Sequence, residues 1–269
     1  RLAGGVAVLD GFEALLGSPR FRDAYAPDLV LHVGRPPTAS GWNPWLRTGP
    51  ERWVLAAGGW PDPWNGATVV HAEPGAALEA LAGALAGASA DGAADRAGWR
   101  DALARASREA RGAIEAALDE RFSEGAAVRA AAAAVPDGGL LALGNSLPIR
   151  EADLYVPAAD RDILVWSQRG ANGIDGLIAG AAGAAAAAGR PATLLLGDVS
   201  FAHDIGGLAA ARDAGADLAI VVLDNGGGRI FEQLPLGAAS ANSRPSSAGR
   251  PKAWAPPWRG CWAMTRSCS

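Results

Sequence analysis

Two oxygen-bearing side chains, Asp198 and Asn225, each follow an apolar run in the second half of the sequence. Asp198 ends the run "LLLGD", and Asn225 ends "IVVLDN" 27 residues further along. Each run is typical of a buried strand, and ligands of parallel sheets bind beyond the carboxyl ends of the strands. A carboxylate oxygen, an amide oxygen and a nearby glycine carbonyl are hard donors that suit Mg²⁺, which completes its shell with phosphate oxygens and water.

The glycines after Asn225 (226–228) strengthen this interpretation, because backbone without side chains can approach an ion closely. A helix N-terminus after such a loop would also favour a bound diphosphate. The competing interpretation is that Asp198 and Asn225 only cap helices. The spacing of the two residues does not decide between a cap and a metal site.

Residues 136–236 must position these side chains. Apolar strand-like runs alternate there with glycine loops and helical stretches, among them the small-residue helix predicted over 176–189. Strands separated by helices imply right-handed crossovers and a parallel sheet covered on both faces. Four predicted strand ends carry polar residues, namely Asn145–Ser146, Arg169, Asp198 and Asn225.

Residues 1–135 show the same alternation. Short β-branched runs at 28–33, 52–57 and 67–72 predict parallel strands, and helices are expected over 75–87 and about 96–120. We therefore expect an α/β protein with two doubly wound parallel-sheet domains, 1–135 and 136–236.

The last segment, 237–269, has a different composition. It contains no Leu, Ile, Val, Phe, Asp or Glu, so it cannot form an amphipathic element and is expected to be disordered. Translation in a shifted reading frame would explain the abrupt change equally well.

Composition excludes several classes of protein. The net charge of −4 gives no electrostatic footprint for nucleic acid, and no apolar run is long enough to predict a membrane span. Cys261 and Cys268, the two cysteines, match no metal or redox spacing. A cytoplasmic location is expected.

The spacing of Gly197–Asp198 and Asn225 resembles the thiamine-diphosphate motif that begins with GD and ends with Asn. Four longer stretches resemble the 2-succinyl-5-enolpyruvyl-6-hydroxy-3-cyclohexene-1-carboxylate synthase family of menaquinone biosynthesis: "GNSLPIREAD", "SQRGANGIDG", "GDVSFAHDIGGL" and "LDNGGGRIFEQLP". This resemblance is dense over 144–235 and looser from about residue 10.

The resemblance implies a fold of three α/β domains, of which 1–135 would be a partial central domain and 136–236 a truncated diphosphate-binding domain. The pyrimidine-binding domain, which contributes a catalytic glutamate across a homodimer interface, would be missing. The chain by itself is then expected to be inactive unless a pyrimidine-binding domain or a full-length subunit is supplied.

The resemblance also implies site residues. Mg²⁺ would be bound by the side chains of Asp198 and Asn225 and by the carbonyl of Gly227, and Ile174 and Ser200 would join these residues in holding thiamine diphosphate. Ser146, Arg150 and Arg169 would bind the carboxylates of 2-oxoglutarate and isochorismate. Arginine suits this task because its planar fork matches a carboxylate. No residue of the chain is assigned as the catalytic acid or base.

Two positions depart from the family pattern. Asp224 stands where the family usually has a second Asn, outside the ligating position. Ala39, Ser40 and Gly41 lie where the family usually has a basic residue, and the next basic residue is Arg47. A cationic contact to substrate is therefore expected to be absent.

Three hypotheses follow. The chain is a transferase component that joins decarboxylated 2-oxoglutarate to isochorismate, with thiamine diphosphate and Mg²⁺. Alternatively, it is a non-catalytic remnant of this enzyme. A third hypothesis, a relative of acetolactate synthase, is disfavoured by "GNSLPIR" and "RGANGIDG".

Overall fold

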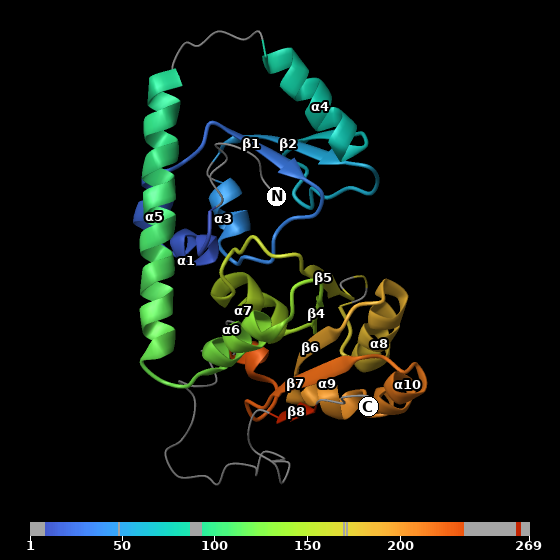
Figure 1. The fold of residues 1–269 in the computed structure, drawn as a ribbon. Coiled ribbons are helices and arrows are strands. Elements are labelled where there is room, and N and C mark those ends of the chain that lie inside the picture. Colours follow the sequence, from blue (N-terminus) through green and yellow to red (C-terminus); the bar gives the residue numbers. More distant parts are fainter. Residues whose placement is uncertain are drawn as a thin grey trace. The chain divides into compact units, whose positions relative to one another are not determined.

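The computed structural model describes residues 9–47, 49–86, 93–168, 170, 172–233 and 262–264. The chain divides into two compact units, Leu2–Ala113 and Ile114–Ser269. Each unit is built around its own sheet of parallel or mainly parallel strands (Figure 1), which confirms the predicted α/β class.

The first unit holds a three-stranded parallel sheet in the order β1-β2-β3. Its elements are α1 (Phe12–Leu16), α2 (Pro19–Ala24), β1 (Leu29–Val33), α3 (Trp42–Leu46), β2 (Glu51–Ala56), β3 (Thr68–His71), α4 (Pro74–Leu85) and the first part of α5 (Ala93–Asp119). Leu16, Phe21, Trp45, Leu46 and Leu103 form its buried core. The three strands coincide closely with the predicted ones because their β-branched runs are bounded by Gly, Pro and Asp.

The second unit holds a five-stranded sheet in the order β5-β4-β6-β7-β8, parallel except for β8. Its elements after α5 are α6 (Glu124–Ala134), β4 (Leu140–Leu143), α7 (Leu147–Tyr155), β5 (Leu164–Ser167), α8 (Leu177–Ala188), β6 (Ala192–Gly197), α9 (Asp198–His203), α10 (Gly207–Asp213), β7 (Leu218–Leu223), the short 3-10 helix η1 (Arg229–Gln233) and β8 (Trp262–Met264).

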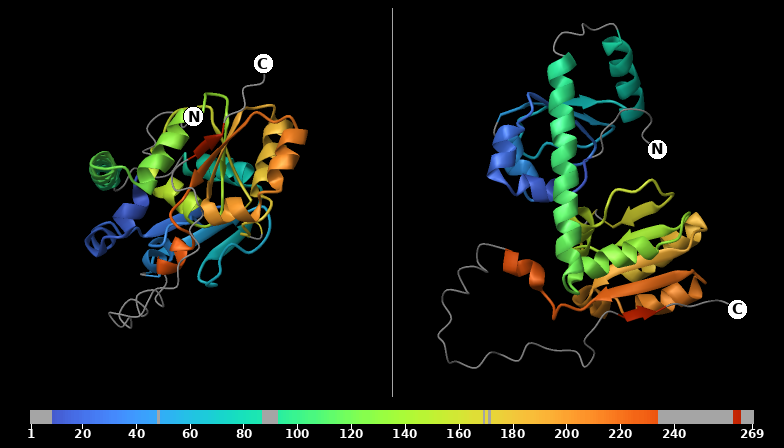
Figure 2. Two further views of the ribbon diagram at one scale, coloured as in Figure 1. Left: turned by 90° about the horizontal axis from the view of Figure 1, so that it is seen from below. Right: turned by 60° about the vertical axis from the view of Figure 1, so that its left-hand side comes forward.

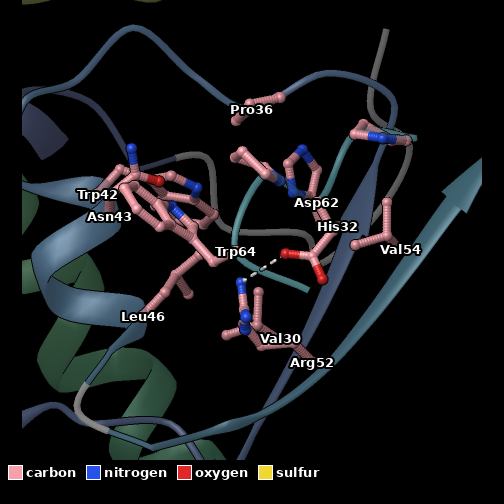
Figure 3. A pocket seen from close by; sticks show the side chains of 12 residues that line it. Val30, His32, Pro36, Trp42, Asn43, Leu46, Arg52, Val54, Asp62 and Trp64 are labelled. Atoms are coloured by element: carbon pink, nitrogen blue, oxygen red, sulfur yellow. Dashed lines mark hydrogen bonds and ion pairs between the residues drawn. The ribbon is translucent and has the colours of Figure 1, made fainter. Parts of the chain in front are cut away.

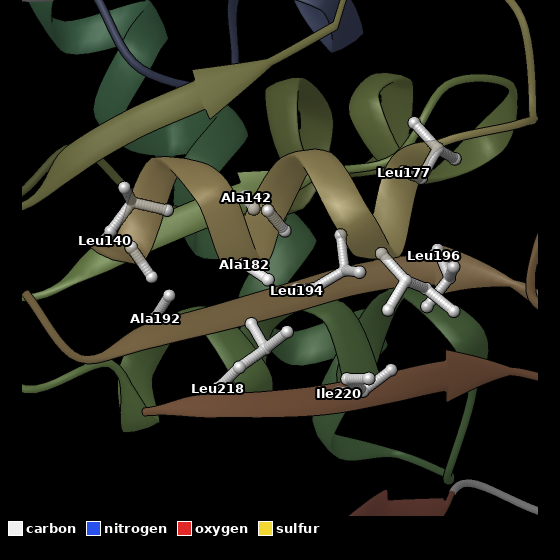
Figure 4. Packing of buried hydrophobic residues seen from close by; sticks show 12 residues of the cluster. Leu140, Ala142, Leu177, Ala182, Ala192, Leu194, Leu196, Leu218 and Ile220 are labelled. Atoms are coloured by element: carbon white, nitrogen blue, oxygen red, sulfur yellow. The ribbon is translucent and has the colours of Figure 1, made fainter. Parts of the chain in front are cut away.

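Two layers of helices cover this second sheet. On one face α8 packs on Leu194 and Leu196 of β6, and on the other α6 packs around Leu195 and Leu223. The helix α8 can lie close to the strands because three of its buried residues, Ala181, Ala182 and Ala185, are small. Figure 4 shows Ala182 of α8 over the strands beside Ala142 and Leu194. The sheet is therefore doubly wound, as predicted.

Two features differ from the sequence-based boundaries. The units divide within α5, and α6 packs on the second sheet through Ala127 and Val128, although it lies before the predicted boundary at residue 135. The segment 237–269, expected to be disordered, contributes the strand β8, which pairs antiparallel with β7 (Figure 2). The free edge of β7 offers backbone hydrogen-bonding groups to any short extended segment, whatever its composition. The rest of that segment lies outside the described residues.

Replacing Leu195 with alanine is expected to lower the free energy of unfolding by about 2–5 kcal/mol, because it leaves a cavity in a buried strand. Leu195 is 0% exposed on β6, whereas Val165 on the edge strand β5 is 59% exposed. Urea denaturation should show this loss for Leu195→Ala and a change within about 0.5 kcal/mol for Val165→Ala. Equal effects of the two variants would contradict the assigned burial.

Candidate functional site

The candidate site lies at the carboxyl-end edge of the second sheet. Gly197 at the end of β6 is in register with Leu223 at the end of β7, so the residues that follow these two strands are neighbours. A small open pocket lies at this edge. It is lined by Glu124, Ser146, Leu147, Pro148, Gly197, Asp198, Val199, Ser200, Asn225, Gly228, Arg229 and Ile230.

Asp198 begins helix α9 directly after β6. Its Oδ1 accepts a hydrogen bond from the backbone N–H of Val199 at 2.8 Å. Burial raises the pKa of Asp198, and the nearby carboxylate of Asp224 raises it further. The ionised carboxylate is therefore held in surroundings that favour the binding of a cation.

Asn225 and Gly227 lie opposite Asp198 in the loop after β7. The backbone N–H of Gly227 donates to Oδ1 of Asn225 at 3.2 Å. Gly226, Gly227 and Gly228 all have positive φ angles, of 82°, 79° and 66°. A Cβ atom on Gly227 would lie 3.1 Å from Cγ2 of Val199 and 3.8 Å from Oδ2 of Asp198. The loop backbone thus passes close to the carboxylate, as the sequence-based interpretation requires of a shared ion.

Ser146 lines the same pocket from the end of β4. It has φ 76° and ψ −128°, a conformation that costs a residue with a side chain about 1–3 kcal/mol and is concentrated at functional sites. Its carbonyl accepts a hydrogen bond from Nη1 of Arg150 at 2.6 Å. The preceding Asn145 is 1% exposed, and its amide donates to the carbonyls of Gln168 and Gly173 at 3.1 and 2.6 Å. Asn145 therefore ties the loop after β5 to the end of β4.

The remaining predicted residues are placed as follows. Ser200 is 3% exposed and lines the pocket from α9. Ile174 is half-buried in the loop before α8 and is not among the lining residues. Arg169 lies outside the described residues. The structure thus brings together Ser146, Asp198, Ser200, Asn225 and the Gly227 loop, with Arg150 bonded to Ser146.

Two acidic residues of this region, Glu124 and Glu151, had no role in the sequence analysis. Glu124 starts α6 and accepts a hydrogen bond from Nδ2 of Asn225 at 2.9 Å. Burial raises the pKa of Glu124, and the hydrogen bond from Asn225 opposes that rise. Burial and the charge of Glu124 raise the pKa of Glu151 in α7 to about 7. The only signal for Glu124 was Ser123 before it, a residue type typical of helix N-caps.

Glu151→Gln is expected to stabilise the protein at pH 8 and to leave its stability nearly unchanged at pH 4. The pKa of Glu151 rises from 4.5 to about 7 on folding, so the folded state retains a proton that the unfolded state releases between these values. Stability is complete below pH 4.5 and falls as the pH rises to 7, because the ionised carboxylate is disfavoured in the fold.

After allowance for solvent screening, we expect a gain of about 1–2 kcal/mol at pH 8. Urea denaturation at both pH values measures it, with the exposed Glu120→Gln as control. An equal effect of Glu151→Gln at both pH values would show that the cause is packing rather than charge.

A second pocket lies in the first unit, and Figure 3 shows the side chains that line it. Arg52 and Asp62 form an ion pair at 3.5 Å, and Asp62 also accepts from the backbone N–H of Ala67 at 2.7 Å. The space left in the pocket is that of about one water molecule. We therefore interpret the ion pair as structural and do not assign a ligand site to this pocket.

Residues 39–41, where the family usually has a basic residue, also lie in the first unit. The backbone N–H and hydroxyl of Ser40 both donate to Oε1 of Glu13, at 3.1 and 3.2 Å. The next basic residue, Arg47, lies over the ring of Trp64 with its guanidinium carbon 5.9 Å from the centroid. The guanidinium of Arg47 thus makes a cation–π contact within the first unit.

Two further properties hold for the described residues alone. No three His, Cys, Asp or Glu side chains gather there as a metal-binding group, which is compatible with a donor set of one carboxylate, one amide and one carbonyl. No helix in that part of the chain has the length and apolar character needed to cross a membrane.

Comparison with known proteins adds independent information. Residues 155–255 match the family described as "Thiamine pyrophosphate enzyme, C-terminal TPP binding domain". The chain is 44% identical over 248 residues to the 2-succinyl-5-enolpyruvyl-6-hydroxy-3-cyclohexene-1-carboxylate synthase of Sorangium cellulosum, with 89% of this chain and 40% of the relative covered.

Enzymes of the same name from Myxococcus xanthus and Bacillus velezensis are 38% and 35% identical, with 88% and 85% of this chain and 40% and 39% of the relatives covered. The chain therefore spans about two fifths of the length of these relatives. The chain is thus similar along most of its length to part of these 2-succinyl-5-enolpyruvyl-6-hydroxy-3-cyclohexene-1-carboxylate synthases, and its residues 155–255 are similar to a thiamine pyrophosphate-binding domain.

Proposed function

We propose that the second unit binds thiamine diphosphate through Mg²⁺ held by Asp198, Asn225 and the carbonyl of Gly227. The observation that carries the proposal is the approach of the Gly227 backbone to the Asp198 carboxylate, at the strand ends of a domain that matches the thiamine pyrophosphate family. The donors fit the group, because Mg²⁺ prefers carboxylate, carbonyl and phosphate oxygens. Burial raises the pKa of Asp198, the neighbouring carboxylate of Asp224 raises it further, and a bound divalent cation would stabilise the ionised form.

The other residues of the site are assigned to cofactor and substrate. Ser200 lines the pocket and would contact the cofactor, with Ile174 as an apolar contact. Thiamine diphosphate, when bound, supplies the electron sink that decarboxylation of a 2-oxo acid requires. Ser146, Arg150 and Arg169 would bind and orient substrate carboxylates by charge-assisted hydrogen bonds.

The substrates we propose are 2-oxoglutarate and isochorismate, and the reaction is the carboligation that gives the product in the relatives' name, in menaquinone biosynthesis. Both substrates are dicarboxylates, which explains cationic residues beside the cofactor site. The activity is that of a transferase, and a cytoplasmic location fits these substrates.

Catalysis would also need the glutamate of a pyrimidine-binding domain, supplied by a separate polypeptide or a full-length subunit, in a dimer of the kind expected for the family. We expect no turnover from this chain by itself, because the resemblance assigns none of its residues to that glutamate's task. The alternative is a non-catalytic remnant that retains the fold.

A carboligation assay with 2-oxoglutarate and isochorismate tests the proposal, run with and without a separately expressed pyrimidine-binding domain. Calorimetric titration with thiamine diphosphate and Mg²⁺ accompanies it. Mg²⁺-dependent binding together with turnover only in the presence of the added domain is the expected result. A folded chain that binds no cofactor would be the non-catalytic remnant.

A further inference from the structure

Glu124 contacts Asn225, although the two residues lie 101 positions apart in the sequence. Nδ2 of Asn225 donates to Oε1 of Glu124 at 2.9 Å. Both residues line the pocket at the ends of β6 and β7. The contact therefore joins the start of α6 to the loop that carries the proposed metal ligand.

The chemistry of this contact selects one orientation of the Asn225 amide. An ionised carboxylate only accepts hydrogen bonds, whereas the two ends of an amide differ, since NH₂ donates and oxygen accepts. Glu124 therefore requires the NH₂ group on its side. The backbone N–H of Gly227 requires oxygen on the other side, where it donates to Oδ1 at 3.2 Å. Both partners select the same orientation, which presents the oxygen that a cation needs.

The position of Glu124 is fixed by the helix to which it belongs. Ser123 caps α6, and its hydroxyl accepts from the backbone N–H of Ala126 at 3.2 Å. Ala127 and Val128, 9% and 0% exposed, anchor the same turns in the core. An acidic residue in the first turn is also favoured by the helix dipole. The carboxylate is thus held on a rigid element rather than on a loop.

We propose that Glu124 is a positioning residue, which holds the amide of Asn225 with Oδ1 toward the bound cation. The inference rests on the proposed binding of thiamine diphosphate and Mg²⁺ at this site. A flipped amide would present NH₂, which cannot ligate a cation. Groups that orient metal ligands typically contribute about 10–100-fold to metal affinity.

The test compares Glu124→Ala in two backgrounds, because a carboxylate at position 225 has oxygen at both ends and needs no orientation. With Asn225 present, we expect Glu124→Ala to weaken Mg²⁺-dependent binding of thiamine diphosphate about tenfold. Glu124→Gln should stay close to wild type, because its carbonyl oxygen still accepts from Nδ2. In the Asn225→Asp background, Glu124→Ala should not weaken binding. There it removes a carboxylate that would repel the carboxylate at position 225.

Calorimetric titrations of the whole chain with Mg²⁺ and thiamine diphosphate give these affinities, and thermal unfolding reports on the fold. The exposed Glu120→Ala serves as the matched control. An equal loss in both backgrounds would show that Glu124 acts through charge or stability and would overturn the inference. So would wild-type affinity in Glu124→Ala. Absence of binding by the wild-type chain would instead refute the proposed function.

Discussion

Asp198→Ala and Asn225→Ala are each expected to abolish Mg²⁺-dependent binding of thiamine diphosphate. Each variant removes one of the two side-chain oxygens in the proposed donor set, and the carbonyl of Gly227 cannot replace it. The two variants should differ in stability. Burial and Asp224 raise the pKa of Asp198, so its ionised form is disfavoured in the fold, and its removal should not destabilise the protein at neutral pH.

Asn225→Ala, by contrast, leaves Glu124 and the N–H of Gly227 without the partner that each has now. We expect it to lower the free energy of unfolding by about 1–3 kcal/mol. Calorimetric titration and thermal unfolding measure the two properties separately. Asp213→Ala, an exposed carboxylate on α10, is the control and should change neither. Unchanged cofactor affinity in Asp198→Ala would refute the metal assignment.

The parallel strands were predictable because they form short, fully apolar runs. The run at the end of β6 is buried from Ala192 to Leu196 and is followed at once by Gly197 and Asp198, so its composition indicates both burial and the end of the strand. The edge of the sheet that would carry the site followed from the same observation, since strand ends meet there. Spacing alone left the metal site and the helix caps as equal alternatives.

Glu124 and Glu151 could not be predicted, because their importance depends on contacts between segments that lie far apart in the sequence. Glu124 lies in a sequence that indicates a helix start and nothing more, and its partner Asn225 is 101 positions away. The raised pKa of Glu151 depends on burial and on the charge of Glu124, neither of which is visible in a local pattern. The pairing of β8 was likewise hidden, since backbone groups rather than side chains make it.

We expect replacement of Arg150 to weaken substrate binding strongly and to change cofactor affinity little. Its Nη1 donates to the carbonyl of Ser146 at 2.6 Å, which holds the guanidinium near the pocket. Within the described residues no carboxylate forms an ion pair with Arg150. Its charge is therefore available to a substrate carboxylate.

In an enzyme reconstituted with a pyrimidine-binding domain, Arg150→Ala should raise the KM for the dicarboxylate substrate about 10–100-fold, as expected from the loss of a charge-assisted hydrogen bond of about 1.5–3 kcal/mol. The affinity for thiamine diphosphate should remain, because the proposed Mg²⁺ ligands Asp198 and Asn225 are untouched. The same result is expected for Arg169→Ala, and the exposed Arg212→Ala on α10 is the control. Steady-state kinetics and cofactor titration separate the two properties. Loss of cofactor affinity in Arg150→Ala would assign the guanidinium to the diphosphate or to the strained turn at Ser146. The cofactor titration contains no substrate, so a residue that binds only the substrate carboxylate leaves its result unchanged.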